Sequence, residues 1–259
     1  MANKMFDLTG KVAIVTGGSK GIGRSICENM ARAGAKVVVS SRKLAVCEEV
    51  VAGIKKEGGE AIAVQANISD KSQLERLVSE TRKAFGRIDI VVCNAAANPY
   101  YGPLKDLPDE AFLKIMQNNV LSNLWLANMT CPEMAERGEG SVIIVSSIGG
   151  LIGSRVLAAY GMSKAADFSL CKSLAMEWGK SNVRVNVIAP GLIKTDFAKA
   201  LWSNPAILKQ METNSPLGRI GEPDDIGGGA VFLASKAAAF VTGQIIIADG
   251  GVTSSGGES

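Results

Sequence analysis

The chain has 259 residues, of which 47% are hydrophobic and 20% charged, and its formal net charge is +3. This length and composition suit one α/β domain with a sizeable core, and the basic residues are too dispersed to make nucleic acid an expected partner. No histidine occurs, which excludes Ser-His-Asp and Cys-His nucleophiles and any His-ligated metal, so no metal site is expected.

Short apolar runs alternate with helical patterns along the whole chain. The runs cover 12–16, 37–40, 61–66, 88–92, 142–145, 183–188 and 244–248, and the helical patterns cover 24–33, 70–85, 110–129, 158–178 and 223–234. Most runs are continuously apolar, as in strands buried on both faces. The alternation predicts an α/β fold over 1–259, a single doubly wound Rossmann-type domain with about seven parallel strands and helices on both faces.

The first strand runs into a glycine-rich turn, Gly17-Gly18-Ser19-Lys20-Gly21-Ile22-Gly23. Glycines permit positive φ and let backbone N–H groups approach a pyrophosphate at the start of the following helix. The spacing is G-x-x-x-G-x-G, and it lies at the first βα turn, where a doubly wound sheet holds its nucleotide. We therefore expect the residues from Gly17 to Gly23 to contact a dinucleotide.

The second strand ends in Ser40-Ser41-Arg42-Lys43 without a carboxylate. Folds that bind NAD usually place an acidic side chain here for the ribose hydroxyls. Ser41 and Arg42 instead leave room and positive charge for a ribose 2′-phosphate, and Lys20 offers a second cation. This pattern favours NADP(H) over NAD(H). The alternative is that Arg42 and Lys43 only begin a solvated helix.

Six motifs in order resemble the short-chain dehydrogenase/reductase family, from about residue 10 to residue 251. They are the glycine turn, Asn94-Ala95-Ala96, Asn119, Ser147, Tyr160-x-x-x-Lys164 and Pro190-Gly191. The resemblance implies hydride transfer between a nicotinamide cofactor and an alcohol or carbonyl carbon. The residues after the second strand and around Asn94 and Pro190 resemble the NADPH-dependent carbonyl reductase/retinol dehydrogenase branch.

The proposed acid–base chemistry rests on Tyr160 and Lys164, which share one face of a helix because they are four residues apart. A nearby ammonium and an oxidised nicotinamide favour the phenolate, so we expect the pKa of Tyr160 to fall from its ordinary value of about 10. Tyr160 then replaces the missing histidine as general acid and base. By resemblance, Lys164 also holds the nicotinamide ribose.

Two further catalytic roles are carried over by resemblance. Ser147, at the end of a strand, donates to the substrate oxygen, and its spacing from Tyr160 selects it over Ser146. Asn119 is the fourth catalytic residue, its backbone anchoring a water that relays protons to Lys164; Val120 favours it over Asn118. More cofactor contacts are implied at the ends of later strands: Asn67, Ile68, Asn94, Ala95, Ala96, Pro190, Gly191, Ile193 and Thr195.

The resemblance implies that the segment 192–216 forms a substrate lid. Its apolar residues, with others near Tyr160, suggest an apolar pocket for a small hydrophobic ketone or dicarbonyl; they are Phe197, Leu201, Trp202, Ile207, Leu208, Met211, Leu151, Ile152, Val156 and Tyr100 or Tyr101. The first alternative is a 3-oxoacyl-acyl-carrier-protein reductase, whose carrier needs a basic patch such as Arg137, Lys172, Lys180 and Arg184. The second is a non-catalytic dinucleotide-binding regulatory protein.

The remaining expectations concern assembly and location. The helical patterns around Trp125 and over 165–178 have more apolar positions than one core-facing stripe needs. Together with the resemblance, these positions predict a homotetramer. Five cysteines without a C-x-x-C pair suggest reduced thiols in the cytoplasm. Residues 1–7 are too polar for a signal peptide, the apolar stretch 141–161 is too interrupted for a membrane span, and 255–259 matches no prenylation or peroxisomal signal.

Overall fold

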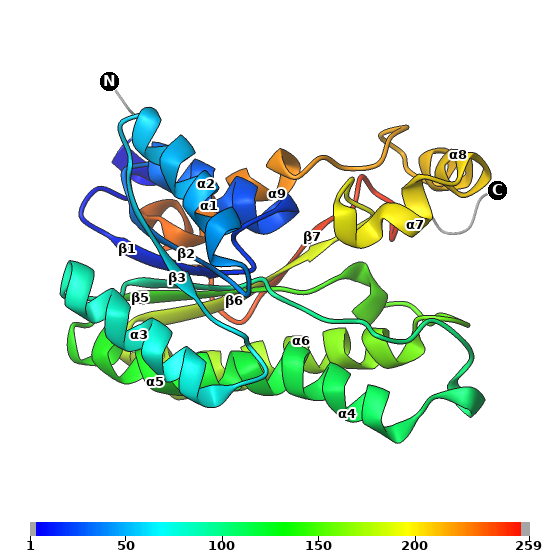
Figure 1. The fold of residues 1–259 in the computed structure, drawn as a ribbon, viewed down its shortest axis with the longest axis horizontal. Helices are drawn as coiled ribbons and strands as arrows, with labels where there is room; N and C mark the ends of the chain where they lie inside the picture. Colours follow the sequence, from blue (N-terminus) through cyan, green and yellow to red (C-terminus); the bar gives the residue numbers. More distant parts are fainter. Residues whose placement is uncertain (1–3, 255–259) are drawn as a thin grey trace.

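The computed structural model describes residues 4–254, so the predictions for 255–259 and part of 1–7 fall outside the described residues. Its centre is a seven-stranded sheet in the order β3-β2-β1-β4-β5-β6-β7, parallel throughout (Figure 1). The strands are β1 Val12–Thr16, β2 Lys36–Ser41, β3 Glu60–Gln65, β4 Ile90–Cys93, β5 Gly140–Val145, β6 Val183–Pro190 and β7 Ile245–Ala248. The predicted fold class and its strands are confirmed.

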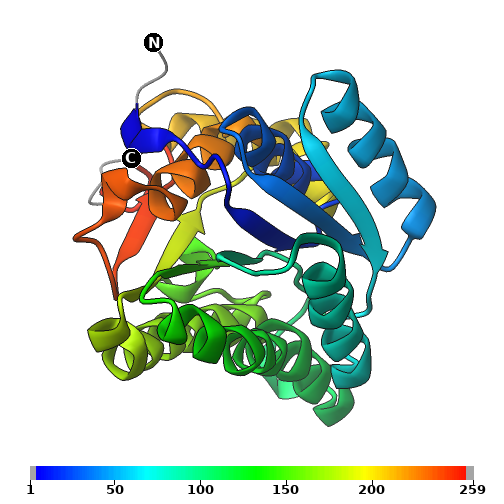
Figure 2. The ribbon, with the colours of Figure 1, turned by 90° about the vertical axis from the view of Figure 1, so that its left-hand side faces the viewer.

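Helices cover both faces of the sheet, as Figures 1 and 2 show. One face carries α1 (Gly21–Arg32), α2 (Leu44–Lys56) and α9 (Asp224–Ala234), and the other carries α3 (Lys71–Phe85), α4 (Asp109–Met116), α5 (Ser122–Glu136) and α6 (Ala158–Trp178). Two short helices, α7 (Lys199–Trp202) and α8 (Pro205–Thr213), lie beside the end of the sheet toward which the strands point.

The strands belong to two hydrophobic cores because successive side chains point to opposite faces. In β1, Ala13 and Val15 join the core under α1, α2 and α9, whereas Ile14 joins the core under α3, α5 and α6. All five residues of β1 and all six of β5 are buried. This two-sided burial explains why the runs are continuously apolar.

The helix predicted over 110–129 is interrupted. A π-helical segment, Gln117–Leu121, separates α4 from α5, and α2, α7 and α8 were not among the predicted helices. Such π segments are single-turn insertions that are frequent at functional sites. Here the segment contains Asn118 and Asn119, and both side chains are buried.

The sheet reverses its order between β1 and β4. The chain builds β1, β2 and β3 outward in one direction and then returns to place β4 on the other side of β1. The loops that follow β1 and β4 therefore diverge, and open α/β sheets bind ligands in the resulting crevice.

The glycine turn after β1 has no space for side chains at two positions. Gly17 has φ +67°, and a Cβ there would lie 2.7 Å from Asn94 Nδ2. A Cβ on Gly23 would overlap the carbonyl oxygen of Gly17. The turn is thus packed directly against the loop after β4.

We expect Gly23→Ala to lower the free energy of unfolding by about 1–3 kcal/mol, because an added methyl group must displace the backbone of the turn. The matched control is Gly53→Ala in α2, where an added Cβ meets nothing within 4 Å. Because alanine is a better helix former by up to about 1 kcal/mol, the control should be neutral or stabilising. Urea denaturation measures both; equal stability of the two variants would contradict the close packing at Gly23.

Candidate active site

Thr16 and Asn94 tie the two loops at the crevice together. Thr16 Oγ1 accepts hydrogen bonds from the backbone N–H groups of Asn94 and Ala95 at 3.1 and 3.2 Å. Asn94 Nδ2 donates to the carbonyl oxygen of Thr16 at 2.9 Å. Asn94 thus acts here on the protein backbone and fixes the glycine turn relative to β4.

The first turn of α1 fits an anion. Its N-cap residue, Lys20, provides no side-chain cap for the helix amides. Backbone N–H groups at a helix N-terminus attract phosphate, and the bare glycines leave room for close approach. The residues present therefore fit the pyrophosphate of a dinucleotide.

The two cations predicted for a ribose phosphate differ in their surroundings. Arg42 is exposed at the end of β2, and its guanidinium forms no ion pair within residues 4–254. Lys20 instead pairs with Asp196 of the segment 192–216 at 3.0 Å, with both side chains more than half exposed. Arg42 is thus available for a ligand, whereas Lys20 has to leave Asp196 first.

The residues after β3 are mainly occupied within the protein. Asn67 Oδ1 accepts a hydrogen bond from the backbone N–H of Ser69 at 3.3 Å, and the Asn67 backbone N–H donates to Gln73 at 2.9 Å. Ile68 packs against the core under α3 and α5. Both side chains remain partly exposed, so a contact with the adenine would use their exposed atoms.

Tyr160 and Lys164 lie on one face of α6, with the ammonium 5.6 Å from the centre of the phenol ring. Lys164 is only 2% exposed. Its Nζ donates to the carbonyl oxygen of Val145, the last residue of β5, at 3.0 Å, and pairs with Asp167 at 3.3 Å. The lysine head is therefore anchored to the carboxyl end of the sheet.

The two adjacent serines after β5 have different partners. Ser146 is buried, and its hydroxyl donates to the carbonyl oxygen of Lys164 at 2.9 Å. Ser147 is half-buried and accepts a hydrogen bond from the backbone N–H of Gly149 at 3.0 Å, which leaves its own O–H available as a donor. This geometry favours Ser147 as the residue that meets a substrate oxygen.

The two adjacent asparagines of the π segment also differ. Asn118 Nδ2 donates to the backbone carbonyl oxygen of Lys114, one turn earlier in α4, at 2.8 Å. Asn119 accepts from the backbone N–H of Ala97 at 2.8 Å and donates to Ser163 Oγ of α6 at 3.0 Å. Asn119 therefore connects the loop after β4 to the helix that carries Tyr160 and Lys164.

Two effects in the protein oppose the fall in the pKa of Tyr160 that was expected from Lys164 and an oxidised nicotinamide. Burial raises the pKa of the phenol, Lys164 lowers it, and Asp167 raises it further, so the net shift is upward. The sequence analysis missed Asp167, which is fully buried. A carboxylate three residues after Lys164 in an apolar helix was the signal that would have identified it.

The segment after β6 returns toward the glycine turn. A Cβ on Gly21 would lie 2.8 Å from Thr195 Cγ2. Gly191 packs against Asp249 after β7, and a Cβ there would lie 2.9 Å from the Asp249 Cα. Ile193 is buried in the core, so only its backbone is free to meet a cofactor. Thr195 therefore lies beside the glycine turn, as expected from its predicted role, and Pro190 ends β6.

The lid residue Phe197 lies over Tyr160, with ring centres 6.2 Å apart. Leu151 and Ile152 are also exposed apolar residues, in the segment that leads to α6. The backbone N–H of Gly102 donates to the carbonyl oxygen of Val156 at 2.9 Å, which brings the Tyr100–Tyr101 loop to the same segment. Exposed apolar side chains therefore lie on Phe197 beside Tyr160 and on the segment that leads to α6.

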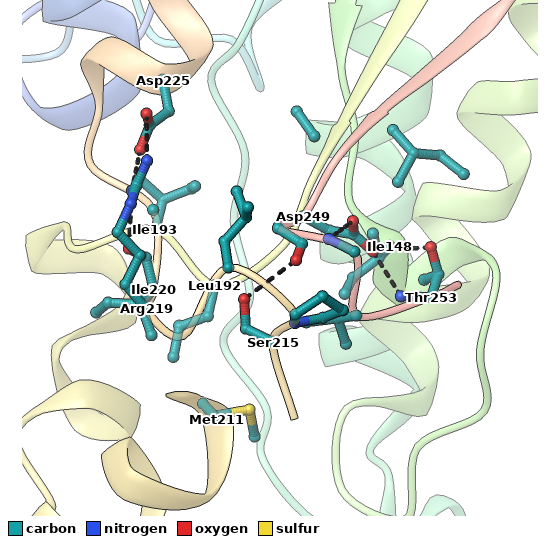
Figure 3. Close-up of a pocket in the computed structure, with 18 of the residues that line it drawn as sticks. Ile148, Leu192, Ile193, Met211, Ser215, Arg219, Ile220, Asp225, Asp249 and Thr253 are labelled. Carbon is teal, nitrogen blue, oxygen red and sulfur yellow. Dashed lines mark hydrogen bonds and ion pairs between the residues drawn. The ribbon is translucent and has the colours of Figure 1, made fainter. Parts of the chain in front are cut away.

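A cavity of about 590 Å³ lies between the lid and the end of β7 (Figure 3). Leu192, Ile193 and Met211 line one side, and Ile148 and Asp249 line the other. Tyr160 and Ser147 do not line it, so it adjoins the proposed catalytic residues without containing them. Of the apolar lid residues predicted for the substrate pocket, Met211 alone lines this cavity within the part of the chain that the structure describes.

The five cysteines are all buried and free. Within residues 4–254, no helix combines the length and the apolar character needed to cross a bilayer.

Comparisons with known proteins agree with this arrangement. Residues 17–253 match the family model described as enoyl-(acyl carrier protein) reductase. Dehydrogenase/reductase SDR family member 4 of Bos taurus is 41% identical over 244 residues, which cover 94% of this chain and 88% of the bovine protein.

Two solved structures share the fold almost completely. A 7α-hydroxysteroid dehydrogenase complexed with NADH and 7-oxo glycochenodeoxycholic acid has a TM-score of 0.93 at 36% identity, covering 97% of this chain and 98% of that one. A gluconate 5-dehydrogenase from Burkholderia cenocepacia, in complex with NADP and tartrate, has a TM-score of 0.93 at 29% identity with the same coverage. The chain therefore belongs to the short-chain dehydrogenase/reductase family of nicotinamide-dependent oxidoreductases.

Proposed function

We propose that this protein is an NADP(H)-dependent oxidoreductase that interconverts a carbonyl and a secondary alcohol. The main support for this proposal is the pair Tyr160 and Lys164 on one face of α6, with the ammonium 5.6 Å from the centre of the phenol ring. Ser147 lies just after β5, and the Asn119 side chain donates a hydrogen bond to Ser163 of α6. A proton donor, a cation and a hydroxyl donor thus meet at the carboxyl end of a parallel sheet.

Each side chain has a defined task in this proposal. When bound, the nicotinamide supplies or accepts the hydride at the substrate carbon. The Tyr160 phenol donates its proton to the carbonyl oxygen in reduction, and its phenolate accepts a proton from the alcohol in oxidation. The Ser147 hydroxyl donates to the same oxygen as charge develops there. Lys164 favours the phenolate and holds the ribose hydroxyls.

The backbone carbonyl oxygen of Asn119, proposed to hold a water, already has one partner within the protein. Its carbonyl oxygen already accepts a hydrogen bond from Asn123 Nδ2 at 2.6 Å. A carbonyl oxygen has two lone pairs, so one remains for a water that leads to Lys164.

Arg42 supports the preference for NADP(H). Its exposed guanidinium lies at the end of β2, next to the glycine turn in the sheet order, and no carboxylate is present there. Gly17, Ser19, Gly21, Ile22 and Gly23 would hold the pyrophosphate. Related proteins carry either cofactor in their solved structures, so the family alone does not select one.

The exposed apolar side chains near Tyr160 support a small hydrophobic ketone or dicarbonyl as substrate. Phe197 is 61% exposed and faces Tyr160, and a substrate ring or chain would cover such surface favourably. We infer that the whole chain acts as one catalytic domain in which 192–216 serves as the lid.

A 3-oxoacyl-acyl-carrier-protein reductase is the weaker alternative because two cations of the suggested basic patch are occupied. Arg184 donates to the carbonyl oxygens of Ala238 and Ser235, and Arg137 pairs with Glu133 at 3.3 Å. A purely regulatory protein is disfavoured because all four proposed catalytic residues are retained at one sheet edge.

A homotetramer in the cytoplasm remains part of the proposal. Met162 and Met176 of α6 are 44% and 84% exposed, and covering such side chains with another subunit is favourable. Trp125 and Met129 instead pack against the protein's own core. Five free, buried thiols fit a reducing compartment.

Tyr160→Phe removes one oxygen and keeps the ring. We expect kcat to fall by about 10²–10⁴-fold, the usual contribution of a general acid or base, while dinucleotide affinity stays nearly unchanged. Initial rates and fluorescence titration with NADPH measure the two quantities. Strong residual turnover would remove Tyr160 from the acid–base role.

Arg42→Asp should lower the ratio of kcat/KM with NADPH to kcat/KM with NADH by roughly ten- to a hundredfold, as expected for losing a charged contact to phosphate. Lys56→Asp makes the same change of charge at the other end of α2 and should leave the ratio unaltered. An unchanged ratio in Arg42→Asp would exclude Arg42 from the phosphate site.

A further inference from the structure

Asp167 is a fully buried carboxylate on α6, one turn beyond the proposed catalytic lysine. Its side chain is 0% exposed. Its Oδ2 pairs with Lys164 Nζ at 3.3 Å, and its Oδ1 accepts a hydrogen bond from Asn123 Nδ2 of α5 at 3.0 Å. Removing an ion from water is costly, so a carboxylate in this place needs partners that offset the cost of its burial.

The first consequence of these contacts is mechanical. The Lys164 ammonium has three N–H groups, and two of them are held by Asp167 and the carbonyl oxygen of Val145. Asn123 continues the network, because it also donates to the carbonyl oxygen of Asn119 at 2.6 Å. Lys164 is thus fixed from α5, α6 and β5 together.

The second consequence is electrostatic. An ammonium beside Tyr160 favours the phenolate, and an anion paired with that ammonium offsets the effect. The titratable groups that act on Lys164, within the described residues, are Asp167, Tyr160 and Cys93 of β4. Burial raises the pKa of the Cys93 thiol far above neutrality. Burial raises the pKa of Asp167, whereas the Lys164 ammonium and the hydrogen bond from Asn123 lower it. Paired with the ammonium at 3.3 Å, Asp167 is the anionic partner in this cluster.

We propose that Asp167 is a positioning residue that anchors Lys164 and, through its charge, keeps the Tyr160 phenol protonated. This inference rests on the proposed function, because it concerns the same acid–base pair. It predicts a site biased toward reduction, since a protonated phenol is the form that donates to a carbonyl oxygen. The net upward shift in the pKa of Tyr160 is consistent with this direction.

The test is the pH dependence of alcohol oxidation, which needs the phenolate. In Asp167→Asn we expect the rising limb of the profile to move to lower pH by on the order of one unit. Oxidation well below the apparent pKa then becomes roughly tenfold faster relative to the plateau. Asp167→Glu retains the charge and should restore the wild-type profile.

Asp89 is a matched control at the opposite edge of the sheet. It is 2% exposed, pairs with Arg87, and accepts a hydrogen bond from the backbone N–H of Val12 at 2.9 Å. Asp89→Asn should lower stability without moving the pH profile. A profile of Asp167→Asn that coincides with that of the wild type would overturn the proposal and assign Asp167 a structural role.

A second measurement needs no substitution in the cluster and no turnover. The chain has three tyrosines, so Tyr100→Phe/Tyr101→Phe leaves Tyr160 as the sole phenol. Its absorbance titration, with folding followed by circular dichroism, should give a pKa above the ordinary value of about 10. A value below that would overturn the proposal even if Asp167→Asn does not fold. Absence of wild-type turnover, by contrast, would reject the proposed function.

Discussion

The buried ammonium of Lys164 is the constraint on which the arrangement of the site depends. A charge that is 2% exposed requires partners, and it finds them in the carbonyl oxygen at the end of β5 and in Asp167. Asp167 lies on α6 itself, whereas the hydrogen bond to Val145 joins α6 to the end of β5 and so fixes the position of the helix against the sheet. Tyr160, one turn earlier on the same face, is thereby held near the carboxyl end of β5, the strand that Ser147 follows.

The surrounding loops extend this anchoring to the nucleotide side of the crevice. Asn119 bonds to Ala97 in the loop after β4 and to Ser163 on α6. Asn94, in the same loop, bonds to the carbonyl oxygen of Thr16 at the glycine turn. A set of side-chain hydrogen bonds therefore connects the glycine turn to the helix that carries Tyr160 and Lys164, across the point where the strand order reverses.

The sequence predicted the sheet well because strands buried on both faces have a simple apolar signature. It also proposed Tyr160, Lys164, Ser147 and Asn119 as catalytic residues, because their order and spacing resemble those of the short-chain dehydrogenase/reductase family. Asp167 was missed because a single carboxylate in a helix is usually a solvated residue. Its place three residues after Lys164 was the only local signal, and its full burial depends on tertiary packing. The π segment at Gln117–Leu121 was missed because its residues continue a helical pattern without a proline or glycine.

The positions of the lid residues also depend on tertiary packing and could not be predicted from the sequence. Its apolar residues were predicted to line one substrate pocket, but their positions depend on how 192–216 folds. Met211 lines the cavity and Phe197 lies beside Tyr160. Ile193, predicted as a cofactor contact, lies in the core and also lines the cavity. Likewise, the pairing of Lys20 with Asp196 joins residues distant in sequence, which no local pattern indicates.

The most direct test of the account is the initial rate of reduction with NADPH and with NADH over aromatic ketones, α-dicarbonyls, β-keto esters and 3-oxoacyl thioesters. The account predicts turnover of small hydrophobic ketones or dicarbonyls with a preference for NADPH. Activity confined to 3-oxoacyl thioesters, or a preference for NADH, would contradict the proposed substrate class or the reading of Arg42, and no turnover with any carbonyl would contradict the proposed catalytic site itself.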